Sequence, residues 1–275
     1  MNKTEHRMKP WSELTLADHF IFQKVMMNDE LCKQVLSEII GKEVVRIERF
    51  DYEKSIMMRY DAKGIQLDVY VKGEDEVYNV EIQNSDNCHI AKRSRFYQSM
   101  IDLELLEKGE EYERLGRSYV IFICTFDYFG RNQYQYTFTY QCEEVEGLEF
   151  GDMTTHIILN TKGSEGNISE KLKTFLKCIE NVFSDDSFSA RIKKEVEQIK
   201  FSEMWRAEYM YYELTLKEHE KIGEERGIEI GEQRGIEIGE NIIKLLKSGN
   251  SVKEVAKELN VSVDDVQKVK DLLAD

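Results

Sequence analysis

The order of periodic segments predicts an α/β protein, in which a mixed sheet is flanked by helices and followed by a helical C-terminal extension. An amphipathic helical pattern over residues 11–40 precedes several segments with strand-like alternation. Residues 119–126 form an unbroken apolar run, which is typical of a strand that is buried on both faces. From residue 168 onward the pattern is helical. A sheet covered by helices is the layered packing that fits this order.

Each expected element rests on a local signal. The apolar stripe of residues 11–40 stops at Gly41, and Asn28 with Asp29 offers a break at which a second helix can be capped. A further helix is expected over residues 88–108, ending at Gly109. The predicted strands are residues 44–50, 55–58, 66–71, 77–83, 119–126, 134–141 and 154–160.

Residues 66–83 are predicted to form a β-hairpin. Both halves alternate apolar and polar residues with a period of two, and the turn between them contains glycine and acidic residues. A loop that is symmetric about residues 74 and 75 places apolar side chains opposite one another on one face. The predicted pairs are Leu67 with Ile82, Val69 with Val80, and Val71 with Tyr78.

The same register places two carboxylates opposite each other on the second face. Asp68 faces Glu81, beside Gln66 and Gln83. Facing side chains lie about 4.5–5.5 Å apart at Cβ, and like charges in such a pair are destabilising. A cation between the carboxylates removes that penalty, and oxygen ligands at about 2.1 Å suit magnesium. The alternative is that both carboxylates face solvent on an edge hairpin.

Five segments in a fixed order carry a resemblance to a known family. They are residues 20–26, 67–69, 80–83, 95–102 and 119–123. In their order and spacing they resemble the PD-(D/E)XK nuclease superfamily, and within it the Rpn-type recombination-promoting nucleases, which are described as transposases. The resemblance extends over most of the chain, and it implies a restriction-endonuclease-like core.

The resemblance implies a catalytic metal site. Asp68 and Glu81 would be catalytic residues that bind Mg²⁺, with Mn²⁺ as a substitute, and Gln83 stands where the superfamily has a lysine. A glutamine can only donate and accept hydrogen bonds, so water activation would rest on the metal. His19 occupies a position where many relatives have an aspartate, and either His19 or its neighbour Asp18 would join the metal.

Three residues on the helix after the site strand are expected to bind the substrate: Arg93, Arg95 and Tyr97. The planar fork of an arginine can hold a phosphate oxygen, and a tyrosine hydroxyl can hydrogen-bond a carboxylate or a phosphate. The alternatives are a solvated charge for Arg95 and packing against the sheet for Tyr97. Gln66 stands where relatives often have an arginine, which removes a positive charge beside the site.

These residues support three interpretations, of which the first two are the main ones. The first is a magnesium-dependent DNA endonuclease that hydrolyses phosphodiester bonds and is linked by resemblance to DNA recombination or mobile elements. The second is a catalytically weak or inactive nuclease fold that acts as a nucleic-acid or protein interaction module, an interpretation favoured by His19, Gln66 and Gln83. The third is a helical interaction protein whose C-terminal tail is the working part.

Composition limits the partners and the compartment. The net charge of −15 is unfavourable for binding DNA over the whole surface, so a local basic patch such as residues 92–95 is needed. No run approaches the roughly 18 apolar residues of a membrane span, and no signal peptide is visible. The five cysteines lack C-x-x-C spacing and suit reduced thiols. We therefore expect a cytoplasmic protein that binds DNA and does not bind a membrane.

The chain is expected to have four parts. They are a PD-(D/E)XK nuclease-like domain over residues 1–165, a helical extension over 166–220, a glycine-rich repeat connector over 221–248 and a short helix-turn-helix-like element over 249–275. In the last part, Asn260 suits the turn and Ser262 suits the cap of the second helix. Asp264 and Asp265 begin that helix, so DNA reading competes with a packing or oligomer contact.

Glycines recur every four residues from Gly223 to Gly239. Each interior glycine costs a helix about 1 kcal/mol relative to alanine. The stripe is either a flexible helical connector or a face through which two copies of the tail associate as a homodimer.

Overall fold

The computed structural model of this chain describes residues 9–47, 49–56, 65–73, 75–86 and 89–273. The chain divides into two compact units, Met1–Tyr209 and Met210–Asp275. The first unit has two apolar clusters, one against each face of a sheet, and the second unit has a small cluster of its own. The finer division at residues 165, 220 and 248 stays a prediction.

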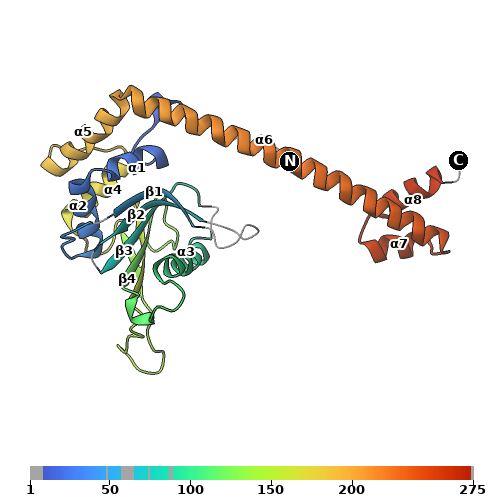
Figure 1. Ribbon diagram of the computed structural model, residues 1–275, viewed down its shortest axis with the longest axis horizontal. Helices are drawn as coiled ribbons and strands as arrows, with labels where there is room; N and C mark the ends of the chain where they lie inside the picture. Colours follow the sequence, from blue (N-terminus) through green and yellow to red (C-terminus); the bar gives the residue numbers. More distant parts are fainter. Residues whose placement is uncertain (1–8, 48, 57–64, 74, 87–88, 274–275) are drawn as a thin grey trace. The chain divides into compact units, whose positions relative to one another are not determined.

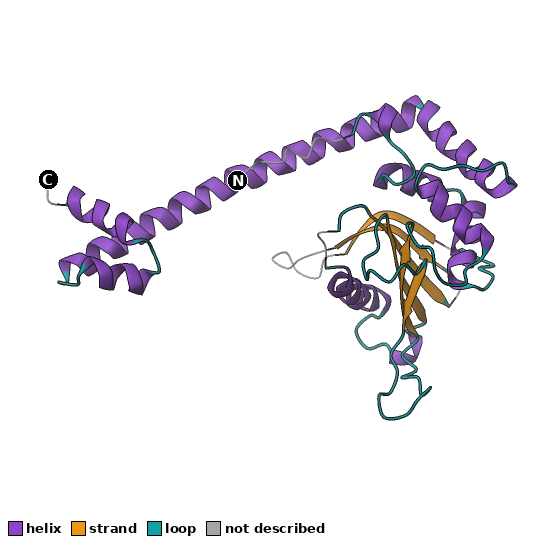
Figure 2. Cartoon of the chain, turned by 180° about the vertical axis from the view of Figure 1, so that it is seen from behind, coloured by secondary structure: helices purple, strands orange, loops and turns teal. Residues whose placement is uncertain are grey.

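The first unit is built on a sheet that is packed against helices (Figure 2). In the described residues its six strands have the order β1-β2-β3-β4-β6-β5. Strands β3, β4 and β6 run parallel to one another, whereas β1–β2, β2–β3 and β5–β6 are antiparallel pairs. The predicted α/β fold with a mixed sheet is thus confirmed. The strands are β1 (Arg49–Ile56), β2 (Ile65–Lys72), β3 (Glu76–Gln83), β4 (Arg117–Cys124), β5 (Gln135–Phe138) and β6 (Thr154–Asn160).

Helices cover both faces of this sheet (Figure 1). One cluster joins Val69 and Val71 of the sheet to four helices and to Tyr209 at the end of the unit, and the other joins Val120 and Phe122 to a single helix, α3. Since α3 is alone on its face, it lies directly over the central strands. The elements are α1 (His19–Met26), α2 (Asp29–Ile40), α4 (Glu170–Ile179) and α5 (Ser187–Phe201) on the first face, α3 (Ile90–Leu105) on the second, and the short 3₁₀ turns η1 (Trp11–Glu13) and η2 (Tyr112–Arg114).

The N-terminal helical region is interrupted as predicted. The Asn28 side chain accepts a hydrogen bond from the Leu31 N–H at 3.1 Å and caps α2. Gly41 ends α2 with a φ of 75°, a left-handed conformation that glycine adopts without steric cost. The predicted helix over residues 88–108 is shorter, because α3 ends at Leu105.

The expected strands at residues 44–50 and 55–58 are replaced by the single strand β1, and residues 57–58 lie outside the described part. The segment before β1 packs on α2 instead of pairing. Val44 is buried there, and its N–H donates to the Ser37 hydroxyl at 2.9 Å. A side-chain acceptor has taken the place of a neighbouring strand.

The hairpin register is confirmed for Val69 with Val80 and for Val71 with Tyr78. The ladder of β2 with β3 ends at Val69, so the predicted pair of Leu67 with Ile82 is wrong. Leu67 instead packs in the cluster on the α3 face. The reason lies in the carboxylates of Asp68, which precedes Val69, and Glu81, which follows Val80; their contacts with the main chain are described below.

The second unit contains the C-terminal helices. Helix α6 (Glu203–Lys247) runs through the glycine repeats without a break. Its end packs against α7 (Val252–Leu259) and α8 (Val263–Leu272) around Ile242, Val255 and Val266. Asn260 has a φ of 52° in the turn, and Ser262 accepts from the Asp265 N–H at 3.1 Å. No described helix combines the length and the apolar character that a membrane span requires.

The glycine stripe does not form one straight face. A helix turns about 100° per residue, so positions four apart drift by about 40° and the five glycines wind through roughly 160°. A Cβ added at any glycine from Gly223 to Gly239 would have no heavy atom within 4 Å. Among the described residues, none packs on these positions, and a straight second helix could contact only part of the stripe.

The first prediction concerns these open glycines. Gly227→Ala and Gly231→Ala should each stabilise the helix by about 1 kcal/mol, because alanine lowers the entropy cost and meets no clash. The measurement is thermal unfolding of the full chain, followed by circular dichroism at a helix wavelength.

Gly116→Ala is the matched control, because its Cβ would meet the main-chain carbonyl oxygen of Asp75. Such overpacking costs about 1–3 kcal/mol, so this variant should melt earlier. If the alanines in α6 lower the melting temperature instead, another helix contacts the glycines, as the homodimer prediction requires.

Candidate active site

The two predicted carboxylates meet where the β2–β3 ladder ends. The Asp68 N–H donates to Glu81 Oε1 at 3.1 Å, and the Ile82 N–H donates to Asp68 Oδ2 at 3.0 Å. Each carboxylate is therefore held by a main-chain donor of the opposite strand. Both residues are buried, Asp68 with 6% and Glu81 with 2% of its surface exposed. The alternative of two solvent-facing carboxylates on an edge hairpin does not match this burial.

Burial raises the pKa of Glu81 well above its usual range, and the negative charge of Asp68 raises it further. The Asp68 N–H, the nearby Asn79 amide and the Arg93 guanidinium oppose this rise without cancelling it. Two buried carboxylates side by side are costly unless positive charge compensates them. The negative charge of the pair is therefore not fully compensated. Two carboxylates in this state provide the oxygen ligands that a hard cation prefers.

Asn79 adds a second sign of a polar site. Its side chain is fully buried, and neither its Nδ2 nor its Oδ1 has a hydrogen-bond partner. It precedes Glu81 by two residues on β3, so it lies on the same side of the strand. The amide is near enough to lower the pKa of Glu81 but lies outside hydrogen-bond geometry. Buried amides without partners are rare, and they mark functional positions more often than packed cores.

Helix α1 contributes His19 and Gln23. His19 Nδ1 lies 3.0 Å from Asp68 Oδ2. The Gln23 amide nitrogen donates to the Asp68 carbonyl oxygen at 3.0 Å and also contacts His19 Nε2 at 2.9 Å. An amide nitrogen only donates, so His19 Nε2 is the acceptor and Nδ1 carries the proton that faces Asp68. This network fixes the position of the imidazole and orients Asp68.

Gln23 is a site residue that the sequence reasoning missed. Its surface is 1% exposed, which is unusual for a glutamine. The available signal was a polar residue inside the apolar stretch from Phe20 to Met26.

The structure separates the two candidates on α1. Asp18 Oδ2 accepts from the Thr15 N–H at 2.7 Å, and Asp18 Oδ1 pairs with Lys9 Nζ at 2.7 Å. Asp18 is thus engaged in the turn before α1, and His19 is the residue that lies against Asp68. A role for His19 as a metal ligand stays a prediction, because its Nε2 accepts from Gln23 in this arrangement.

Helix α3 contributes a positive charge. Arg93 Nη1 donates to Gln83 Oε1 at 2.6 Å, and Arg93 Nη2 lies 3.6 Å from Glu81 Oε2. The same Nη2 donates to the Tyr97 hydroxyl at 3.0 Å, and the guanidinium lies 5.2 Å from the centre of the Phe122 ring. Arg93, predicted as a phosphate ligand, is therefore positioned between the carboxylate and the glutamine that replaces the superfamily's lysine.

Of the other predicted substrate residues, Tyr97 lies behind this cluster and Arg95 lies apart from it. The Tyr97 ring packs on Phe122 with ring centres 5.9 Å apart, so the packing alternative applies, together with the hydrogen bond from Arg93. Arg95 is exposed and lines hollows on the other flank of α3. The basic patch at residues 92–95 stays a prediction. The side chain of Gln66 lies outside the described part of the structure.

A metal at this site would have few protein ligands. In the described ranges, no group of three or more His, Cys, Asp or Glu residues is arranged to hold a metal ion. Magnesium often needs only one or two carboxylates, since water and substrate phosphates complete its shell. Asp68 and Glu81 meet that requirement, and the donors fit a hard cation.

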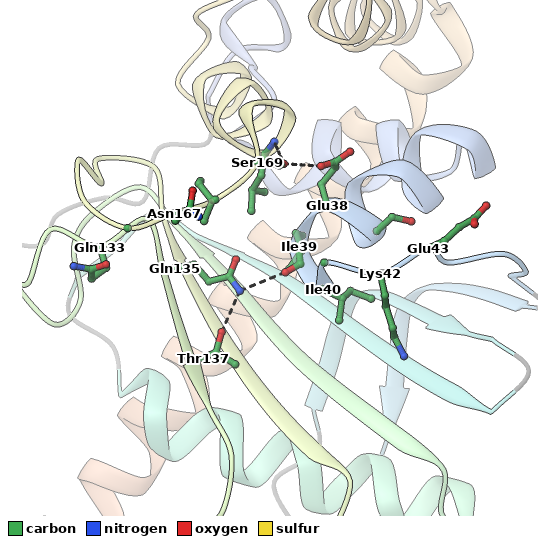
Figure 3. A pocket seen from close by; sticks show the side chains of 15 residues that line it. Glu38, Ile39, Ile40, Lys42, Glu43, Gln133, Gln135, Thr137, Asn167 and Ser169 are labelled. Atoms are coloured by element: carbon green, nitrogen blue, oxygen red, sulfur yellow. Dashed lines mark hydrogen bonds between the residues drawn. The ribbon is translucent and has the colours of Figure 1, made fainter. Parts of the chain in front are cut away.

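A larger hollow of about 710 Å³ lies elsewhere, between α2, the start of α4 and β5 (Figure 3). Gln135 Nε2 donates there to the Ile39 carbonyl oxygen at 3.3 Å, and the Ser169 hydroxyl donates to Glu38. None of the predicted site residues lines it. Its side chains satisfy one another, so its size does not make it the catalytic site.

Comparison with known families agrees with this geometry. A family model described as PD-(D/E)XK nuclease family transposase matches residues 19–226. The chain belongs to this family. The match begins at His19, spans Asp68, Glu81 and Gln83, and ends within α6. Comparisons with curated proteins and with solved structures give no match.

Membership confirms the resemblance and the fold, and it suggests a nuclease associated with mobile elements, with DNA as the implied substrate. The catalytic, metal-binding and substrate-binding roles of individual residues remain predictions. The geometry adds Gln23 to them and assigns Arg93 a place beside Glu81.

The second prediction concerns the charge repulsion between the carboxylates. The folded-state pKa of Glu81 is raised, so the folded state binds more protons than the unfolded state. That contribution to stability is present at low pH and is lost as the pH rises from about 4.5 through the folded-state pKa. In a chelating buffer, Glu81→Gln should lose this slope and should melt about 2 °C or more above the wild type at neutral pH.

Glu113→Gln, at an exposed position in η2, is the control and should retain the wild-type pH profile. Thermal melts across pH 4 to 9, about the range in which this group titrates, measure the difference. Parallel profiles for Glu81→Gln and the wild type would contradict a strained carboxylate pair.

Proposed function

We propose that the chain is a divalent-metal-dependent DNA endonuclease in which Asp68 and Glu81 hold the metal, with Mg²⁺ as the ion and Mn²⁺ as a substitute. The observation that carries the proposal is the buried carboxylate pair, in which each carboxylate is fixed by a main-chain N–H of the opposite strand. When bound, such a metal neutralises the scissile phosphate, lowers the pKa of a water and stabilises the leaving oxygen.

The protein's own part is to hold the carboxylates in position before substrate arrives. The Ile82 N–H and the His19 Nδ1–H both direct Asp68 Oδ2, while Gln23 fixes the main chain of Asp68. Groups held by several donors lose little further freedom on binding, which is how preorganised sites favour the transition state.

Arg93, which is hydrogen-bonded to Gln83, supplies the positive charge that the superfamily's lysine would supply. The two ends of the Gln83 amide are occupied, since Oε1 accepts from Arg93 and Nε2 donates to the Ser85 carbonyl oxygen at 3.0 Å. Gln83 therefore positions the guanidinium. An arginine remains protonated at any working pH, so Arg93 stabilises developing negative charge and does not act as a base.

A second function has one observation in its favour. Arg93 lies 3.6 Å from Glu81 Oε2 and offsets part of the charge that a metal would neutralise. A family member that had lost its metal could keep this pair as a structural contact and act as a nucleic-acid or protein interaction module. The difference between the two functions is whether a metal still binds and whether DNA is cleaved.

The third prediction tests the endonuclease. With Mg²⁺ or Mn²⁺, the wild type should nick plasmid DNA, and Asp68→Asn and Glu81→Gln should each reduce the rate by more than about 100-fold. Loss of a direct ligand costs more than the roughly 10–100-fold that its outer partners cost.

Asp86→Asn, which changes an exposed carboxylate in the loop after β3, is the control and should cleave normally. Measuring metal-induced thermal stabilisation on the same variants separates binding from chemistry. An absence of both cleavage and metal stabilisation in the wild type would favour the interaction module.

The fourth prediction tests the arginine. Arg93→Gln should lower kcat by about 100-fold with a smaller change in KM, as expected for a group that acts on developing charge. Adding Gln83→Lys to this variant returns a positive charge to the same place and should recover at least part of the activity.

Lys92→Gln removes an exposed charge from the adjacent position and serves as the control. Plasmid cleavage at saturating and limiting DNA gives both kinetic parameters. A double variant no more active than Arg93→Gln alone would show that charge at this place is not what the reaction requires.

A further inference from the structure

The second flank of α3 forms a groove that the carboxylate site does not use. A hollow of about 320 Å³ lies between α3 and the β5–β6 edge of the sheet, and a hollow of about 300 Å³ adjoins it. Arg95, Tyr140 and His156 line both hollows, so the two are continuous. We call this continuous hollow the aromatic groove.

Exposed rings form its walls. Phe129 and Phe138 lie with ring centres 5.2 Å apart, and Tyr140 and Phe150 lie 6.4 Å apart. These four rings are between 37% and 78% exposed, although large aromatic side chains usually avoid water. Aromatic faces that gather at the surface of a hollow are suited to stacking on a flat ring.

Hydrogen-bonding groups of α3 and β6 line the aromatic groove. The Ser94 hydroxyl lies 2.6 Å from His156 Nδ1, and burial lowers the pKa of His156, so the imidazole is neutral at pH 7. Gln98 is 7% exposed, and its Nε2 donates to Asp102 at 2.8 Å and to Ser118 at 2.7 Å. Its Oε1 has no partner. A buried acceptor without a donor is a place that can accept an N–H of a ligand.

The lining of the aromatic groove contains both positively and negatively charged side chains. Arg95 makes no ion pair with any described residue and is exposed at the place where the two hollows meet. Asp102 and Asp152 line the second hollow and add acceptors beside Gln98. The aromatic groove thus offers faces for a flat ring, acceptors for N–H groups and one cation for a phosphate.

We propose that the aromatic groove binds an unpaired nucleobase of the DNA substrate, one that carries an exocyclic amino group, with Arg95 on the adjacent phosphate. An amino base presents N–H donors that meet the acceptors, and its ring stacks on the aromatic walls. A paired base would hide its face in the stack and would use one of its amino hydrogens in pairing. An aliphatic segment of a protein would leave the acceptors unsatisfied.

This inference rests on the proposed function, and it deepens it by naming the form of DNA that is recognised. Arg93 on one flank of α3 reaches the carboxylate site, while Arg95 on the other flank borders the aromatic groove. Because one rigid helix carries both, a base held in the aromatic groove would keep its strand beside the carboxylates.

The fifth prediction is a binding measurement with the full chain in a chelating buffer, where cleavage does not occur. Fluorescence anisotropy would compare labelled strands of about 12 nucleotides made of dA and dC, the same sequence as a duplex, and oligo-dT. At about 50 mM salt, the dA/dC strand should bind at least tenfold more tightly than either of the others.

Phe138→Ala and Tyr140→Ala should each weaken binding of the dA/dC strand by about tenfold, the effect of losing one stacked base. Tyr112→Ala removes a tyrosine that is 79% exposed and lies outside the aromatic groove, so it should bind normally. Circular dichroism confirms that each variant is folded.

Strand binding that is unchanged in both groove variants, or equal binding of dA/dC and dT strands, would overturn the inference. If cleavage is lost in Asp68→Asn while the groove variants bind normally, the endonuclease stands and the aromatic groove fails. If the wild type never cleaves but binds single strands through Tyr140, the aromatic groove stands without the endonuclease.

Discussion

The first unit depends on one exchange between two strands, in which Asp68 and Glu81 each accept an N–H from the opposite strand. The carboxylates take the place of ladder hydrogen bonds, so β2 and β3 stop pairing at Val69 and Val80. This break opens the sheet at the point where α1 and α3 both reach it. Gln23 and His19 then approach from one helix, and Arg93 approaches from the other.

Helix α3 is the only helix on its face of the sheet in the described core, and its two flanks have different chemistry. Arg93 and Tyr97 form one flank, packed on Phe122 and directed to the carboxylates. Ser94 and Gln98 form the other, directed to β4 and β6. Neighbouring positions on a helix are about 100° apart, so adjacent residues serve separate sites without any change in the backbone.

Local patterns predicted most of the hairpin, because strand period and turn composition depend on neighbouring residues alone. The apposition of Asp68 and Glu81 was predicted from that register, and the caps at Asn28 and Ser262 were predicted from their residue types. The position of Leu67 could not be predicted, since side chains rather than the ladder decide it. The contacts of Gln23, those of Arg93 and those within the aromatic groove could not be predicted either, because they join elements that are distant in sequence.

The charge of the carboxylate site bears on whether it still requires a metal. Asp68 and an ionised Glu81 would carry two negative charges, and Arg93 contributes one positive charge. Arg93 stands 3.6 Å from Glu81, and the pKa of Glu81 remains raised in its presence. A pair whose only purpose was structural would be more stable with a closer arginine or with apolar residues in its place. In the proposed function, a bound cation would offset the remaining negative charge.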